Sequence, residues 1–159
     1  MIRRATPLDT PAIHALIREL AAYEKLAHEV TCSVEQLEES LFGGERPAAE
    51  ALVADDEADG IVGFALFFQN YSTFLGRPGL YLEDLFVRPS HRRTGYGRAL
   101  LQALARVAVE RKLGRFEWAV LDWNEPAKRF YESLGAREMA EWRIYRVTGD
   151  ALTELAGRT

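Results

Sequence analysis

The chain has 159 residues, 48% of them hydrophobic, and a formal net charge of −4. That length supports one sizeable core, so we expect a single domain over residues 1–159. The modest, mixed charge argues against a nucleic-acid partner, which needs a broad basic face, and an acidic protein suits a cationic small substrate. Cys32 is the only cysteine, which excludes an intrachain disulfide and a thiolate zinc cluster. No window resembles a signal peptide or a membrane span, so we expect a cytoplasmic protein.

The N-terminal half predicts two helices and a β-hairpin. A short strand at residues 2–5 precedes a helix that begins near Thr6-Pro7 and ends around Lys25 or Leu26. Ser33 and Gln36 form a capping box for a second helix, which ends at residues 43–44. Strands at 51–54 and 61–69 flank an acidic turn that contains glycine, as expected of an antiparallel hairpin.

The C-terminal half alternates strands with helices. A loop over residues 70–79 leads to a strand at 80–87, and an amphipathic helix follows at 97–113. The remaining elements are a strand at 116–121, a helix that ends at residue 134, a final strand at 141–147, and a last segment, 149–159, that forms a short helix or frays. This order predicts an α/β (α+β) fold with a mixed sheet and helices on its faces.

A basic turn between the strand at 80–87 and the following helix predicts an anion site. The first N–H groups of a helix have no intrahelical partner and carry the positive end of its dipole. Gly95 and Gly97 let the backbone approach a phosphate, and Arg92, Arg93 and Arg98 add mobile positive charge. Leu100 stands where a dinucleotide fingerprint needs a third glycine, and the Gly-Lys-Ser/Thr of a P-loop is absent. By itself the turn is equally compatible with a solvated surface loop.

The pattern Arg92-x-x-Gly95-x-Gly97 after Leu-Phe-Val resembles the acetyl-coenzyme-A signature of the GNAT N-acetyltransferase superfamily. Residues 81–87, 123–126 and 130–136 resemble the diamine branch, which contains the spermidine/spermine and thialysine enzymes, and residues 17–24 and 61–65 are similar too. The resemblance implies a mixed, mainly antiparallel central sheet with helices on both faces. It also implies an N-acetyltransferase that uses acetyl-CoA without a metal and forms a homodimer.

The resemblance assigns the coenzyme to two segments. The pyrophosphate would rest on the basic turn, and the pantetheine arm would pair with the strand before it as an added strand. A backbone N–H near Val87 would polarise the thioester carbonyl, so the strand side chains themselves are expected to be ordinary core. The residues so assigned are Leu85, Phe86, Val87, Arg92, Arg93, Thr94, Gly95, Tyr96, Gly97, Arg98, Asn124, Glu125, Pro126 and Ala127.

Two side chains are the candidate catalysts. By the resemblance, Tyr131 protonates the departing thiolate, which a neutral phenol with a pKa of about 10 can do. Glu83 is the candidate that accepts the proton of the incoming ammonium through water. Without the motif, Tyr131 would be interpreted as a packing residue. Glu83 and Asp84 would be interpreted as part of a surface edge strand, and as neighbours they are expected on opposite faces of the sheet.

The acceptor is expected to be a small cationic amine. The residues assigned to its binding are Tyr23, Glu24, Glu83, Asp84, Glu117, Trp118, Ala119 and Glu141. Ser72-Thr73-Phe74 replaces an Asp-Pro-Trp of the polyamine enzymes and Glu117 replaces a histidine, so a diamine or a thialysine-like amine fits as well as spermidine. Two alternatives remain, a protein or peptide amine acetyltransferase and a noncatalytic acyl-CoA-binding module. His14, His28 and His91 lack a metal-ligand spacing, so no metal site is expected.

Overall fold

The structure, a computed structural model, describes residues 1–157. The chain divides into two compact units, residues 1–121 and residues 122–159. The first unit contains the sheet and the second contains two short helices. Each unit is described separately below.

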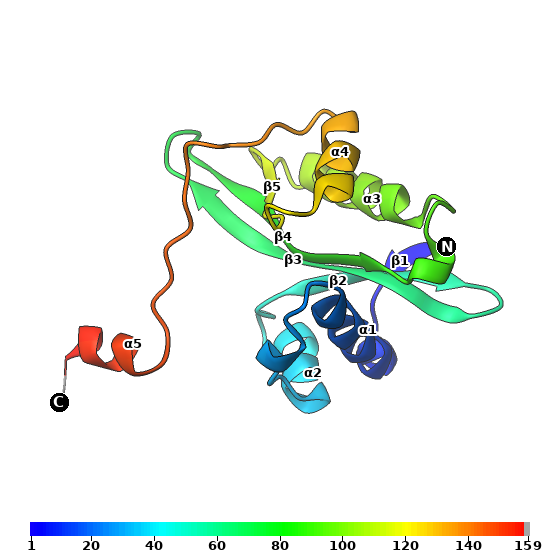
Figure 1. Ribbon diagram of the computed structural model, residues 1–159, viewed down its shortest axis with the longest axis horizontal. Helices are drawn as coiled ribbons and strands as arrows, with labels where there is room; N and C mark the ends of the chain where they lie inside the picture. The colour runs from blue at the N-terminus through cyan, green and yellow to red at the C-terminus, as the bar shows by residue number, and fades with distance from the viewer. Residues whose placement is uncertain (158–159) are drawn as a thin grey trace. The chain divides into compact units, whose positions relative to one another are not determined.

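A five-stranded sheet organises the first unit (Figure 1). Its strands lie in the order of the sequence, and all neighbouring pairs are antiparallel except the last, which is parallel. They are β1 (Ile2–Arg4), β2 (Glu50–Asp56), β3 (Gly60–Ser72), β4 (Arg77–Val87) and β5 (Phe116–Trp118). A parallel pair needs a crossover, which α3 (Tyr96–Glu110) supplies. The predicted mixed, mainly antiparallel sheet is confirmed.

Helices cover both faces of this sheet, as predicted. Figure 1 shows α1 (Thr10–Tyr23) and α2 (Val34–Phe42) on one face and α3 on the other. The core beneath α1 and α2 is made by apolar side chains at helical spacing that meet alternate strand residues, namely Ile13, Leu16, Leu37, Leu41, Ala51, Val53, Phe64 and Phe86. Three short 3₁₀ helices also occur, η1 (Pro7–Asp9), η2 (Ala27–Glu29) and η3 (Pro89–His91). Because η1 intervenes, α1 begins later than the sequence predicts.

The loop expected over residues 70–79 is instead a tight hairpin. Strand β3 continues to Ser72 and β4 starts at Arg77, and these two residues pair directly. Gly76 has a φ of 64°, which a glycine adopts without strain in such a turn. The prediction was wrong because ladder hydrogen bonds between the two strands extend past the apolar part of the sheet into polar sequence.

A β-bulge interrupts the pairing of β3 with β4 where the acidic residues lie. Leu66 pairs with Asp84 and the next residue, Phe67, pairs with Leu82, so Glu83 is the extra residue. A bulge breaks the strict alternation of side chains and can re-aim one of them. Strict alternation does not apply at this position, so the expectation that Glu83 and Asp84 point to opposite faces stays a prediction.

The second unit contains α4 (Glu125–Ser133) and α5 (Gly149–Ala156). Asn124 caps α4, because its side-chain oxygen accepts a hydrogen bond from the Ala127 N–H at 3.3 Å. The strand expected at residues 141–147 does not form, so that prediction is wrong for the chain as the structure describes it. An extended segment becomes a strand only when its backbone groups find a partner strand. Within residues 1–157, no helix is long and apolar enough to cross a membrane.

Candidate active site

The turn between η3 and α3 has the geometry of an anion cradle. Arg93 and Gly95 both have positive φ, 64° and 91°, and such turns direct successive backbone N–H groups into one concavity. Gly95 is the N-cap of α3, and no side chain among residues 1–157 caps this helix end. A Cβ placed on Gly97 would meet nothing within 4 Å, so the space beside it is open. The N–H groups of the first turn are therefore available to an anion.

Arg92 is exposed, but its side chain contacts the end of the strand before the basic turn. Its Nε donates a hydrogen bond to the Val87 carbonyl at 3.1 Å. Its guanidinium carbon lies 4.8 Å from the centre of the Tyr23 ring and 5.5 Å from that of Phe86. Arg92 thus connects the basic turn with the end of α1, where the sequence predicts substrate contacts. Arg93 and Arg98 are exposed and remain the mobile charges of the turn.

The end of β4 has an open edge. Strand β5 pairs with β4 only from Leu80 to Leu82, so residues 83–87 have no strand partner on that side within the described chain. The Arg88 N–H donates to Val62 of β3, and successive residues alternate, so the Val87 N–H faces the open edge. An extended ligand can add to such an edge. Phe86 and Val87 are buried, as expected for core side chains.

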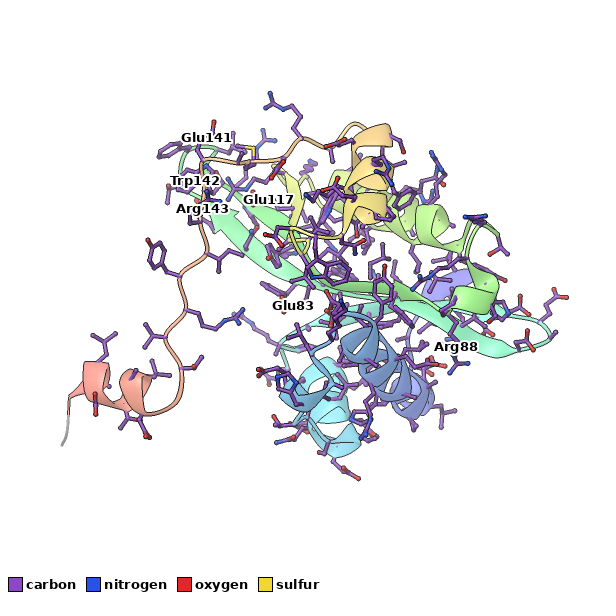
Figure 2. The ribbon with its side chains drawn as sticks, viewed as in Figure 1. Glu83, Arg88, Glu117, Glu141, Trp142 and Arg143 are labelled. Carbon is purple, nitrogen blue, oxygen red and sulfur yellow. The ribbon has the colours of Figure 1, made fainter. Side chains whose placement is uncertain are left out.

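Three carboxylates gather at the bulge beside this edge. Asp84 is partly buried, and burial raises its pKa to about 6, with further contributions from the negative charges of Glu83 and Glu24. Burial also raises the pKa of Glu24 at the end of α1. The effect of Glu83 on Asp84 shows that the two neighbours act on one another electrostatically. Figure 2 shows Glu83 on β4. A cation is the group that such an arrangement favours.

Glu117 on β5 has a different environment. One of its oxygens lies 2.8 Å from Arg115 Nε and accepts a hydrogen bond from Asn70 Nδ2 at 3.3 Å (Figure 2). Its charge, with that of Glu83, raises the pKa of Tyr81, although burial is the larger cause. Glu117 therefore has an arginine partner, Arg115, within the first unit. Asn70 and Arg115 are contacts that no sequence motif identified.

The other predicted residues lie on β5 or in the second unit. Trp118 ends β5 and Ala119 follows it, exposed. Within the second unit, Tyr131 lies on α4 with its ring centre 5.6 Å from that of Phe130. Pro126 and Glu125 form the first turn of α4, where Glu125 contacts Lys128 at 2.8 Å. Glu141 is exposed in the segment after α4 (Figure 2).

Comparison with known protein families identifies the chain. The sequence profile of the acetyltransferase (GNAT) family matches residues 13–136, which include strands β2 to β5, the basic turn and α4. The chain belongs to the GNAT family. It is an N-acetyltransferase, because curated relatives that it matches over nearly their whole length carry that activity.

Two curated relatives and one solved structure illustrate the match. The thialysine N-epsilon-acetyltransferase of Bos taurus is 42% identical, with 99% of this chain and 98% of the relative covered. The L-ornithine N5-acetyltransferase of Arabidopsis thaliana is 37% identical, with 95% and 85% covered. An integron cassette protein from V. cholerae has a TM-score of 0.80 at 26% identity, with 99% and 98% covered. These matches confirm the GNAT resemblance, including its diamine and thialysine branch.

Proposed function

We propose that this N-acetyltransferase transfers an acetyl group from acetyl-CoA to the primary amine of a small cationic acceptor. The observation that carries the proposal is the group of carboxylates on Glu24, Glu83 and Asp84, placed at the bulge next to the open edge of β4. A negatively charged site beside a strand edge brings an ammonium and an extended acyl carrier together. The relatives named for thialysine and L-ornithine support an acceptor among amino acids with a side-chain amine and related diamines.

The donor would lie along β4 and over the basic turn. Its pantetheine amides would pair with the open edge of β4, and its pyrophosphate would accept hydrogen bonds from the N–H groups at the start of α3. The Val87 N–H, which faces that edge, would donate to the thioester carbonyl oxygen as negative charge develops there. Asn124 and the start of α4 supply the remaining coenzyme contacts expected from the family likeness.

The reaction would proceed by direct transfer in a ternary complex. Glu83, through water, accepts the proton that the ammonium must lose before its nitrogen attacks the thioester carbon. Asp84 and Glu24 bind the cation. The C–S bond then breaks, and Tyr131 gives its proton to the thiolate that leaves. The second proton of the attacking nitrogen, which is lost as the amide forms, restores the Tyr131 phenol through water. No acyl-enzyme is needed, and Cys32 is exposed near the start of α2, remote in sequence from every motif of the site.

Thiol release from acetyl-CoA tests the proposal. The acceptor panel contains thialysine, L-ornithine, short diamines, spermidine and a peptide with a free amino terminus. We expect release with the small amines and little with the peptide, because the relatives with this activity are named for small amines. Coenzyme A binding without acceptor-dependent release across the panel would support a noncatalytic module instead, and a preference for the peptide would support a protein acetyltransferase.

Tyr131→Phe tests the proton donor. The variant should lower kcat by about 100-fold while leaving coenzyme A binding intact, since general acid catalysis contributes factors of that order. Tyr145→Phe is the matched control, because Tyr145 is 94% exposed and lies outside every motif. Equal turnover of the two variants with every accepted amine would remove Tyr131 from this role.

The proposal includes a homodimer of one N-acetyltransferase domain, active in the cytoplasm. Its support is the apolar surface after α4, where Trp142 is 75% and Ile144 is 76% exposed. Large apolar side chains that are exposed so close together along the chain favour an interaction surface. A second copy of the chain would cover them. Sedimentation equilibrium should give twice the mass of the chain, and Trp142→Glu should shift the equilibrium toward the monomer. A wild-type monomer at micromolar concentration would contradict this part of the proposal.

A further inference from the structure

The turn of the β2–β3 hairpin contacts the coenzyme turn at two points. Tyr96, the first residue of α3, donates its hydroxyl hydrogen to Asp56 Oδ2 at 2.7 Å. His91 Nε2 lies 2.8 Å from Asp59 Oδ2, in η3 at the other end of the same turn. The hairpin turn and the turn before α3 lie side by side in Figure 1. Both ends of the segment between His91 and Tyr96 are therefore held by one neighbouring turn.

The hydrogen-bond roles at these contacts are fixed by chemistry. A carboxylate only accepts, so His91 Nε2 carries the proton and, in the neutral ring, Nδ1 accepts from the Ser90 hydroxyl at 2.8 Å. The other oxygen of Asp56 accepts from the backbone N–H groups of Ala58 and Asp59, which closes the hairpin turn. The carboxylates, His91 and Tyr96 thus form one connected network. The bond to Asp56 also raises the pKa of Tyr96.

Within the segment held this way, the backbone adopts a conformation that needs support. Arg93 has a φ of 64°, a left-handed conformation that is unfavourable for a non-glycine residue. The Thr94 hydroxyl donates to the His91 carbonyl, which closes the turn from inside. A loop that is ordered before its ligand arrives does not lose that conformational entropy on binding. External bonds at both ends favour the ordered form.

The negative charge of the hairpin turn opposes the binding of an anion at the neighbouring turn. Asp56 and Asp59 carry negative charge next to a turn that would receive a pyrophosphate, and charge alone would weaken its binding. The same residues would strengthen binding if they fix the shape of the turn. The two effects have opposite signs, so an experiment can separate them.

We propose that Asp56 and Asp59 are positioning residues, and that they hold Tyr96 and His91 so that residues 91–96 keep the conformation that binds the coenzyme A pyrophosphate. The proposal rests on the proposed function. It assigns a role to the acidic turn at residues 55–60, which the sequence indicates only as a hairpin turn. The apparent affinity is proportional to the fraction of molecules in which the turn has the binding conformation. Loss of either hydrogen bond, to Asp56 or to Asp59, lowers that fraction and weakens binding.

Calorimetric titration of coenzyme A into the full chain, without an acceptor, is the test. Tyr96→Phe and Asp59→Ala should each weaken binding about fivefold, which is the scale of one ordinary hydrogen bond. Glu57→Ala is the matched control, because Glu57 is exposed in the same turn and its substitution also removes one negative charge. It should leave affinity unchanged or slightly tighter. Adding Asp56→Asn to Tyr96→Phe should cause no further loss, since both remove the same bond.

Steady-state kinetics give a second readout that a general loss of stability would not reproduce. The acetyl-CoA KM should rise in Tyr96→Phe and Asp59→Ala. In Asp59→Ala, kcat, the amine KM and the unfolding temperature should stay close to the wild-type values. If Asp59→Ala binds coenzyme A as tightly as Glu57→Ala, the hairpin turn affects binding through its charge alone. That result would contradict the positioning role of Asp59. If the wild-type chain binds no coenzyme A, the proposed function itself fails, which distinguishes the two results.

Discussion

Two aspartates in the first unit lie in contrasting environments. Asp9 is 8% exposed and accepts two hydrogen bonds from the Arg3 guanidinium, at 2.8 and 2.9 Å. Arg3 and the Thr6 backbone and hydroxyl hold the pKa of Asp9 at about 2, although burial opposes this. Asp84 is also removed from solvent in part, but its charged neighbours are Glu83 and Glu24, and its pKa rises to about 6. Asp9 therefore has an arginine of the chain as its partner, whereas Asp84 lies near two other carboxylates.

The difference separates a structural charge from one that we propose to be functional. Arg3 also donates to Asp55 at 2.8 Å, so Asp9 joins β1, η1 and the end of β2 in one network. Its ionic partner is part of the chain. The charge partner that would stabilise ionised Asp84 is a cation from outside, which is the role proposed for the substrate ammonium. Strained electrostatics of this kind at a strand bulge are typical of functional sites.

The largest expected effect is a loss of stability when the structural carboxylate, Asp9, is removed. Asp9→Ala should lower the free energy of unfolding by about 3 kcal/mol, because it leaves Arg3 without its bidentate partner. Urea denaturation of both proteins at pH 7 measures this. Glu57→Ala, an exposed acid without a buried partner, is the control and should change stability little. Equal stability of Asp9→Ala and wild type would contradict the assignment.

The next effect is on the functional side. Asp84→Asn should raise the KM for the preferred amine by about 30-fold, because a partly buried charge pair with the ammonium is lost. The acetyl-CoA KM should stay close to the wild-type value, since Asp84 is not assigned to the donor. Steady-state kinetics with each substrate varied in turn measure both constants. A rise confined to acetyl-CoA would remove Asp84 from the acceptor site.

The same substitution should stabilise the free protein. A carboxyl whose pKa is higher when folded binds more protons in the folded state, so Asp84 causes stability to fall as pH rises from about 4 to about 6. Asp84→Asn removes that loss and should gain about 1–2 kcal/mol at pH 7.5 and nothing at pH 4. Asp9 has the opposite sign, since its contribution is present above pH of about 4 and is lost as pH falls toward about 2. Denaturation at both pH values checks the signs.

The smallest expected effect is a ligand shift. A diamine at ten times its dissociation constant should stabilise the wild-type chain by about 1.4 kcal/mol, or a few degrees in unfolding temperature. Asp84→Asn should show a much smaller shift at the same concentration. Differential scanning fluorimetry with 1,3-diaminopropane, and sodium chloride of equal ionic strength as control, measures it. Equal shifts in both proteins would mean that the cation binds elsewhere.

Much of the fold could be predicted from local signals. The apolar stripe of α1, the capping box of α2 and the glycine-containing acidic turn of the hairpin each act within a few residues, so the sequence shows them directly. Strand ends are harder to predict, because pairing between chain segments decides them. The ladder that continues to Ser72 and Arg77, and the absence of a partner for residues 141–147, are decided in that way.

By itself the sequence determined the kind of chemistry, since Arg92-x-x-Gly95-x-Gly97 and the segments that contain Glu83 and Tyr131 occur in the order of the GNAT family. Only the tertiary structure decided how the charges are arranged. In the folded chain, Glu83 and Asp84 lie at a bulge of β4, and Glu117 has an arginine partner. Asp56 and Asp59 lie beside the basic turn. The physical reason is that electrostatic and hydrogen-bond energies depend on distances through space, which a linear pattern does not contain.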